Sequence, residues 1–125
     1  MNRISLASGI VPECGPVATI DAARAGGFDA VGLWIEPPQW TAQLMRDARV
    51  RLEASGLELL DVEVVWLKPG APDPDHFRCI DIGAELGAKN VLVVSSDPDE
   101  AATAAKLAAL CAHAAPSGLR VALEF

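Results

Sequence analysis

The chain alternates short apolar runs with segments whose apolar residues recur every three or four positions. The first pattern is typical of buried strands and the second of amphipathic helices. Apolar runs predict strands at 4–8, 30–35, 57–67, 91–95 and 120–125. Helices are expected from Pro16 to about Gly26, from Thr41 to Gly56, from Asp73 to Gly87 and from Asp97 to about Ala115. The order βαβαβαβαβ implies parallel strands, because a helical crossover joins each pair.

Each longer strand has one aliphatic face and one face of different chemistry. The strand at 30–35 alternates Val31, Leu33 and Ile35 with Gly32, Trp34 and Glu36. The next alternates Leu60, Val62 and Val64 with Asp61 and Glu63, and its parity puts Trp66 on the aliphatic side. The last alternates Val121, Leu123 and Phe125 with Ala122 and Glu124. Carboxylates therefore recur on one face of three strands.

This alternation decides between two parallel folds. An open doubly wound sheet has aliphatic residues on both faces, whereas a barrel strand turns one face to the helices and the other to the lumen. The sequence contains neither GxGxxG after the first strand nor GxxxxGK[ST], so nucleotide-binding versions of the open sheet have no support. We predict an α/β fold, a parallel (β/α) barrel of the TIM type. Residues 1–125 would form about half of it, as a single partial domain with strands one to five.

The acidic face also suggests chemistry. Glu36, Asp61, Glu63 and Glu124 can share an enclosed space only if they are protonated, hydrated or neutralised by a cation. A bound divalent metal is one way to neutralise them.

Composition limits the class of protein. With 10 basic and 17 acidic residues the net charge is −7, which argues against a nucleic-acid partner. The three cysteines form no CxxC pair, and no segment has the length of a signal peptide core or a membrane span. We expect a cytoplasmic protein that does not associate with membranes.

Four segments carry a resemblance to a known family. They are 22–34 (AARAGGFDAVGLW), 60–65 (LDVEVV), 86–94 (LGAKNVLVV) and 121–125 (VALEF). In this order and spacing they resemble the xylose-isomerase-like TIM barrels of the sugar phosphate isomerase/epimerase superfamily, over the N-terminal half of the barrel only.

The resemblance implies a metal-dependent isomerase or epimerase of carbohydrate metabolism. Its substrate would be a sugar or sugar phosphate, and it would transfer a proton or hydride next to a carbonyl. The family holds a divalent metal (Mn, Mg, Zn or Co) with Glu, Asp, His and Glu at the ends of strands five to eight. Glu124 matches the first of these and implies a catalytic acid/base role as well, while the other three ligands would lie beyond Phe125. By the same resemblance, Trp34, Glu36 and Glu63 would line the substrate pocket.

Each candidate also has a structural interpretation. Glu124 can be a hydrated terminal residue, Glu63 a hydrated structural carboxylate, Trp34 a packing residue and Glu36 a loop acid. His76 is expected to be an exposed loop histidine, and Asp97 a helix cap.

Two other functions stay open. A non-catalytic half-barrel could serve as a binding or assembly subunit, and an abasic-site endonuclease of the same superfamily is disfavoured by the net charge. Because half a barrel leaves two strand edges unpaired, we also expect self-association or pairing with a missing C-terminal half.

Overall fold

The structure, a computed structural model, describes residues 2–124, so Phe125 lies outside it. Its strands are β1 (Ser5–Leu6), β2 (Ala30–Trp34), β3 (Glu58–Leu67), β4 (Asn90–Ser95) and β5 (Arg120–Glu124). Its α-helices are α1 (Pro16–Ala25), α2 (Ala42–Ser55), α3 (Pro74–Leu86) and α4 (Glu100–Ala114). All neighbouring strands are parallel, in the order β1-β2-β3-β4-β5. The predicted alternation of strands and helices is confirmed.

Capping residues fix most helix ends where the sequence placed them. The Thr41 hydroxyl accepts a hydrogen bond from the backbone N–H of Leu44 at 3.1 Å, which begins α2. Gly56 ends that helix in the left-handed conformation, at φ 70°. The start of α4 was predicted two residues too early, because its cap is Asp99 rather than Asp97.

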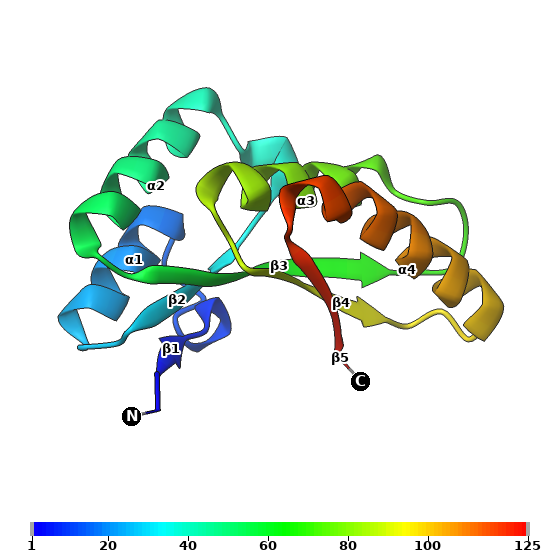
Figure 1. Cartoon of the computed structure of the whole chain (residues 1–125), viewed down its shortest axis with the longest axis horizontal. Helices are drawn as coiled ribbons and strands as arrows, with labels where there is room; N and C mark the ends of the chain where they lie inside the picture. Colours follow the sequence, from blue (N-terminus) through cyan, green and yellow to red (C-terminus); the bar gives the residue numbers. More distant parts are fainter. Residues whose placement is uncertain (1, 125) are drawn as a thin grey trace.

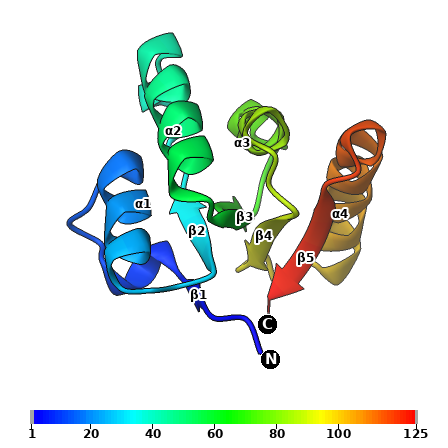
Figure 2. The ribbon, with the colours of Figure 1, turned by 60° about the vertical axis from the view of Figure 1, so that its left-hand side comes forward.

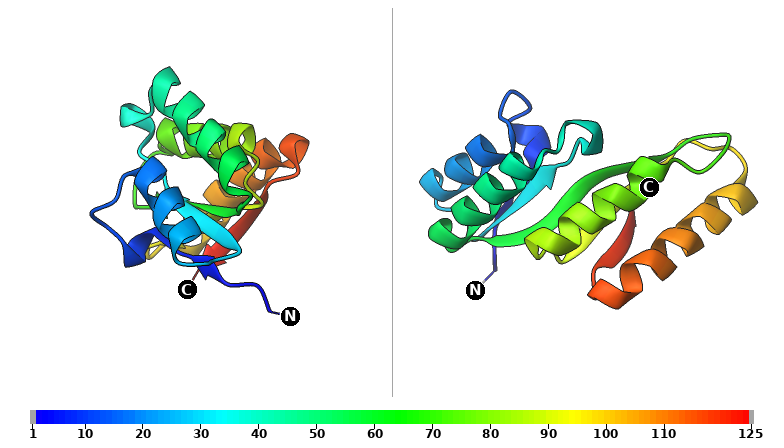
Figure 3. Two further views of the ribbon diagram at one scale, coloured as in Figure 1. Left: turned by 90° about the vertical axis from the view of Figure 1, so that its left-hand side faces the viewer. Right: turned by 90° about the horizontal axis from the view of Figure 1, so that it is seen from above.

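The four helices cover one face of the sheet and leave the other face bare (Figure 1). Seen nearly along the strands, the sheet curves, with α1 to α4 on its outer side and β1 and β5 at its two edges (Figure 2). The helices lie side by side over the sheet in the view from above (Figure 3). An open doubly wound sheet would carry helices on both faces. The half-barrel prediction is therefore confirmed.

The outer face of the sheet forms the core with the helices. Six strand residues of this face are completely buried: Val31, Leu33, Val62, Val65, Val91 and Val93. Close packing at Gly83 of α3 shows how near helix and sheet come, since a Cβ there would lie 2.6 Å from a methyl group of Val62. The close approach of Val62 leaves no room for a side chain at position 83. Glycine is therefore required there, although a glycine in the middle of a helix normally lowers stability.

Two register shifts in β3 overturn part of the predicted alternation. One lies opposite the step from Val31 to Gly32, and the other lies between Val62 and Val65. Each inserts an extra residue, which moves all following side chains to the other face. The buried residues are consequently Leu59, Val62, Val65 and Leu67, rather than Leu60, Val62 and Val64. The prediction that Trp66 faces the helices was wrong, since it lies on the bare face.

In the described part of the chain, no helix combines the length and the apolar character that crossing a membrane requires.

Candidate functional site

The inner face of the sheet carries the candidate residues in rows set by strand register. Gly32 of β2 pairs with Asp61 of β3, and Trp34 pairs with Glu63. Nearer the carboxyl ends, Trp66 pairs with Val94, which in turn pairs with Glu124 of β5. Paired residues of a parallel sheet project to the same side. Trp34, Glu63, Trp66 and Glu124 therefore share the inner face.

Asp61 lies deepest of the carboxylates. A Cβ on Gly32 would collide with its carboxylate, so glycine makes room for this side chain. Burial, with a smaller contribution from the negative charge of Glu63, raises the pKa of Asp61 to about 6. It is thus partly protonated near neutral pH. Its distance along β3 from the carboxyl ends favours a structural role.

Glu63, one row further along, accepts a hydrogen bond from the hydroxyl of Ser8. Ser8 belongs to the short 3₁₀ turn that follows β1 and is buried. This bond fixes the Glu63 carboxylate against the β1–α1 connection. Glu63 is therefore held by the protein itself rather than lying free in solvent.

Trp34 and Glu36 stand together at the carboxyl end of β2. The indole N–H of Trp34 donates to a carboxylate oxygen of Glu36 at 2.6 Å, although the side chain is 45% exposed. Both residues line two adjacent hollows. The first, which we call the Trp34–Trp66 hollow, has a volume of about 420 Å³ and includes Trp66, Lys68, His76 and Lys106. The second, the α1 hollow, has a volume of about 570 Å³ and includes Ser8, Glu13, Gly15 and Trp40.

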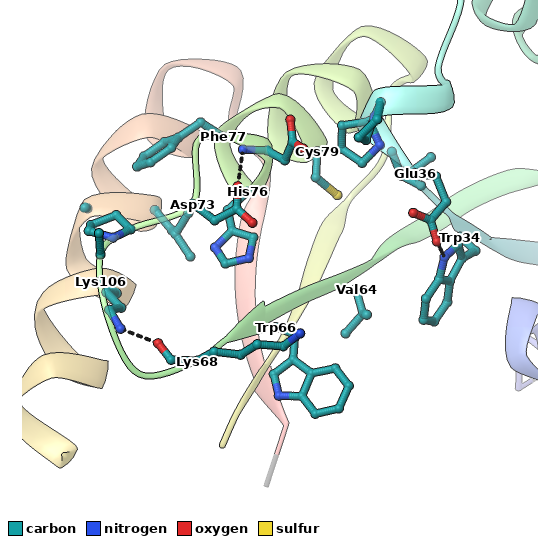
Figure 4. A pocket seen from close by; sticks show the side chains of 18 of the residues that line it. Trp34, Glu36, Val64, Trp66, Lys68, Asp73, His76, Phe77, Cys79 and Lys106 are labelled. Carbon is teal, nitrogen blue, oxygen red and sulfur yellow. Dashed lines mark hydrogen bonds between the residues drawn. The ribbon is translucent and has the colours of Figure 1, made fainter. Parts of the chain in front are cut away.

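Figure 4 shows the Trp34–Trp66 hollow with its two indoles on the same side of β3. Trp66 is 48% exposed, and its N–H donates to the hydroxyl of Ser96 at 2.9 Å. The ammonium group of Lys68 lies 4.8 Å from the centre of the Trp66 ring, a cation–π contact. These contacts hold the ring in one orientation.

His76 begins α3 and lines the same hollow, half-buried. The prediction of an exposed loop histidine was wrong. Burial lowers the pKa of His76, while Asp73 and Asp75 oppose the shift and Lys106 and Lys68 add to it. The imidazole is therefore neutral at pH 7 and able to accept or donate a hydrogen bond.

A nearly buried ion pair braces the loops around this hollow. Lys106 of α4 donates to a carboxylate oxygen of Asp97 at 3.0 Å and to the backbone carbonyl of Lys68 at 2.5 Å, and the two side chains are 10% and 5% exposed. Hydrogen bonds from the Asp99 backbone N–H and from Lys106 lower the pKa of Asp97. Lys106 thus joins the β3–α3 and β4–α4 loops, and Asp97 holds it there instead of capping α4.

Glu124 stands apart from the other candidates. It is exposed at the end of β5 and borders a shallow hollow with Leu92, Ala122 and Leu123. Among residues 2–124 no three His, Cys, Asp or Glu side chains are arranged to hold a metal ion. The carboxylates therefore share a face, as expected, but they do not converge on one cation within the described chain.

Of the residues that the sequence suggested, Trp34 and Glu36 line both hollows, whereas Glu63 and Glu124 line neither. Sequence reasoning did not propose four further lining residues of the Trp34–Trp66 hollow, which are Trp66, Lys68, His76 and Lys106. The second register shift in β3 reverses the side on which Trp66 lies, and the sequence pattern does not reveal it. The other three come from loops and helix starts, where no alternation reports which way a side chain points.

The geometry is that of a TIM-type barrel of which about half the strands are present. Comparison with solved structures shows which barrels the chain resembles. Protein SMc04130 of Sinorhizobium meliloti matches over 98% of this chain and 50% of its own, with 26% identity and a TM-score of 0.78. A fusion of a xylose isomerase-like TIM barrel with 4-hydroxyphenylpyruvate dioxygenase matches 95% of this chain and 21% of its own, with 25% identity and a TM-score of 0.69.

The IolI protein, solved with a bound zinc atom, matches in fold at 14% identity, with a TM-score of 0.80 over 99% of this chain and 51% of its own. No family model and no curated protein matches the sequence. The expected resemblance to xylose isomerase-like barrels and sugar phosphate isomerase/epimerases is confirmed. The chain spans about half the length of most of these structures.

Proposed function

We propose that this chain is part of a metal-dependent isomerase or epimerase that acts in the cytoplasm on a sugar or sugar phosphate. The reaction would move a proton, or a hydride, at a carbon next to a carbonyl. The observation that carries the proposal is the inner face itself, where exposed indoles and carboxylates line the bare side of a half-barrel of this family. Carboxylates supply general acid/base groups, and flat indoles suit the apolar face of a sugar ring.

The proposed metal can take only part of its ligands from the described residues. Glu124 would supply one carboxylate, and the donors that complete the site would lie outside residues 2–124. Hard oxygen donors suit Mg²⁺ or Mn²⁺, and Zn²⁺ or Co²⁺ become possible if a histidine joins them. A bound cation would stabilise negative charge on the substrate oxygen.

The chain's own residues have separable roles in this proposal. Glu124 takes or returns the proton at the reacting carbon. Trp34 stacks on the ring, and Glu36 fixes the Trp34 indole through its N–H and meets a substrate hydroxyl. Glu63 holds Ser8, which lines the α1 hollow.

Replacing Glu124 with Gln tests the proposal. In a full-length barrel that contains this chain and the remaining metal donors, exchange of the substrate's carbon-bound hydrogen with D₂O is followed by NMR on a panel of ketoses and their phosphates, with Mn²⁺ and after chelation. We expect the variant and the chelated protein to lose about 100-fold in rate, because the base or its cation is gone. Glu53→Gln, an exposed acid of α2, serves as the control with the same change in charge. Equal rates in all four samples would contradict the proposal.

The alternative function is a non-catalytic binding or assembly subunit. One observation favours it: Leu123 on the outer side of the edge strand β5 is 42% exposed, whereas its register partner Val93 is fully buried. Such an edge suits pairing with another copy or with a second half-barrel. Light scattering after size exclusion tests this expectation, and a stable monomer at all concentrations would contradict it.

A further inference from the structure

The proposed function leaves open whether the substrate carries a phosphate, and the charges around Trp34 and Trp66 bear on that choice. A phosphate monoester carries about −1.5 to −2 charges at pH 7 and is normally bound by free Lys or Arg side chains or by uncapped helix N-termini. Lys and Arg side chains and helix N-termini both lie near the two hollows.

Two of the three cations near the Trp34–Trp66 hollow are already paired. Lys106 is paired with Asp97 and bonded to the Lys68 carbonyl. Arg78, beside the hollow, donates to Asp75 and to the carbonyl of Pro37, each at 2.9 Å. Lys68 lies over the Trp66 ring. A phosphate would have to compete with a carboxylate and a carbonyl for Lys106 and for Arg78, whereas the exposed indole holds Lys68 only weakly.

The helix N-termini nearest the hollow are occupied as well. Asp73 accepts from the backbone N–H of Asp75 at 2.9 Å at the start of α3, and Asp99 accepts from that of Ala102 at 3.0 Å at the start of α4. Each positive helix end is thus neutralised by its own carboxylate. A phosphate there would meet negative charge.

Within the described chain, the α1 hollow carries acidic side chains and no basic ones. Glu13 and Glu36 line it, and none of its described lining residues is Lys, Arg or His. The N-terminus of α1 at Gly15 has no side-chain cap, but Glu13 lies at the same hollow. Because Glu36 belongs to both hollows, its charge acts on a ligand at either side of Trp34.

From these contacts we infer that the two hollows beside Trp34 bind an uncharged polyhydroxy carbonyl compound and reject its phosphate ester. This inference rests on the proposed function and narrows its substrate class to free sugars or other neutral polyols with a carbonyl. The indoles provide stacking surface, and Glu36, Ser8 and His76 provide hydrogen-bonding groups for hydroxyls. Specificity then comes from repulsion of the wrong ligand as much as from attraction of the right one.

The test compares matched ligands on the whole chain. Binding of D-fructose, D-fructose 6-phosphate and inorganic phosphate is measured by calorimetry and by tryptophan fluorescence. We expect the phosphate ester to bind at least about 10-fold more weakly than the free sugar, and inorganic phosphate not to compete with it. The same comparison is repeated with D-tagatose and its 6-phosphate.

Glu36→Gln isolates the charge, because Gln keeps an oxygen that can accept from the Trp34 N–H. We expect this variant to bind the ester several-fold more tightly while its affinity for the free sugar changes less. Glu53→Gln makes the same change in net charge at a remote site and should leave the ratio of the two affinities unchanged.

The outcomes separate the two proposals. An ester that binds as tightly as the free sugar, or better, overturns the inference and leaves the proposed function standing. An unchanged affinity ratio in Glu36→Gln also overturns it, since the repulsion would then have another source. If neither sugars nor esters bind, both the inference and the proposed function fail.

Discussion

The two faces of the sheet are built from the same strands but differ in every physical respect. On the outer face, Val31, Leu33 and Val62 are completely buried beneath helices. On the inner face, Trp34 and Trp66 keep almost half of their surface exposed. Glu63 lies on the same face, in register with Trp34. Neighbouring residues of one strand therefore lie either in the core or on the open inner face. Mutations one position apart should therefore have separable effects on stability and on binding.

The largest effect is expected from a neighbouring pair in β2. Leu33→Ala should lower the free energy of unfolding by about 3 kcal/mol, because it leaves a cavity under the helices. Trp34→Ala should lower it by about 1 kcal/mol or less, since half of that side chain already contacts water. Urea unfolding followed by circular dichroism measures both. Similar losses for the two variants would break the contrast between the faces.

The next effect concerns Trp66, whose side the sequence misassigned. Trp66→Ala should weaken binding of a free sugar about 10-fold, because a stacking surface in the hollow is removed. Trp66→Phe keeps a ring but not the N–H bond to Ser96, and should bind sugar with intermediate affinity. Calorimetric titration measures the change. An unaltered affinity in Trp66→Ala would mean that the ligand does not contact this indole.

The smallest effect concerns Asp61, the half-buried acid of the inner face. The folded-state pKa of Asp61 is raised from 3.8 to about 6, so the native state holds a proton that the unfolded state releases. The higher pKa of the folded state favours folding only while Asp61 is protonated. The free energy of unfolding therefore falls as the pH rises from 3.8 to about 6. Because Asp61 is partly exposed, we expect a cost of about 1 kcal/mol at neutral pH.

Asp61→Asn should remove that cost. The variant should be more stable than the parent protein at about pH 7 and similar to it at about pH 4. Thermal unfolding at a series of pH values measures the difference. A parent protein whose stability does not fall over this range, or a variant that keeps the same fall, would contradict the raised pKa.

Most of the fold could be predicted from the sequence. Local chemistry decided where helices begin and end, as at Thr41 and Gly56, because caps and left-handed glycines act over a few residues. Alternation in β2 separated Leu33 from Trp34 correctly, since a regular strand has a period of two. Asp97 was misjudged because its lysine partner lies nine residues away on the next helix, which no local rule connects to it.

The amino-acid sequence by itself determined the order of elements, the parallel sheet, the helix-covered face and the family resemblance, because periodicity and capping are local properties. Tertiary structure alone decided the side on which Trp66 lies, the burial of His76 and the pairing of Lys106 with Asp97. A bulge changes the phase of every later residue in a strand, and contacts between loops depend on how distant segments pack. For those residues the position in space, rather than the neighbours along the chain, sets the chemical environment.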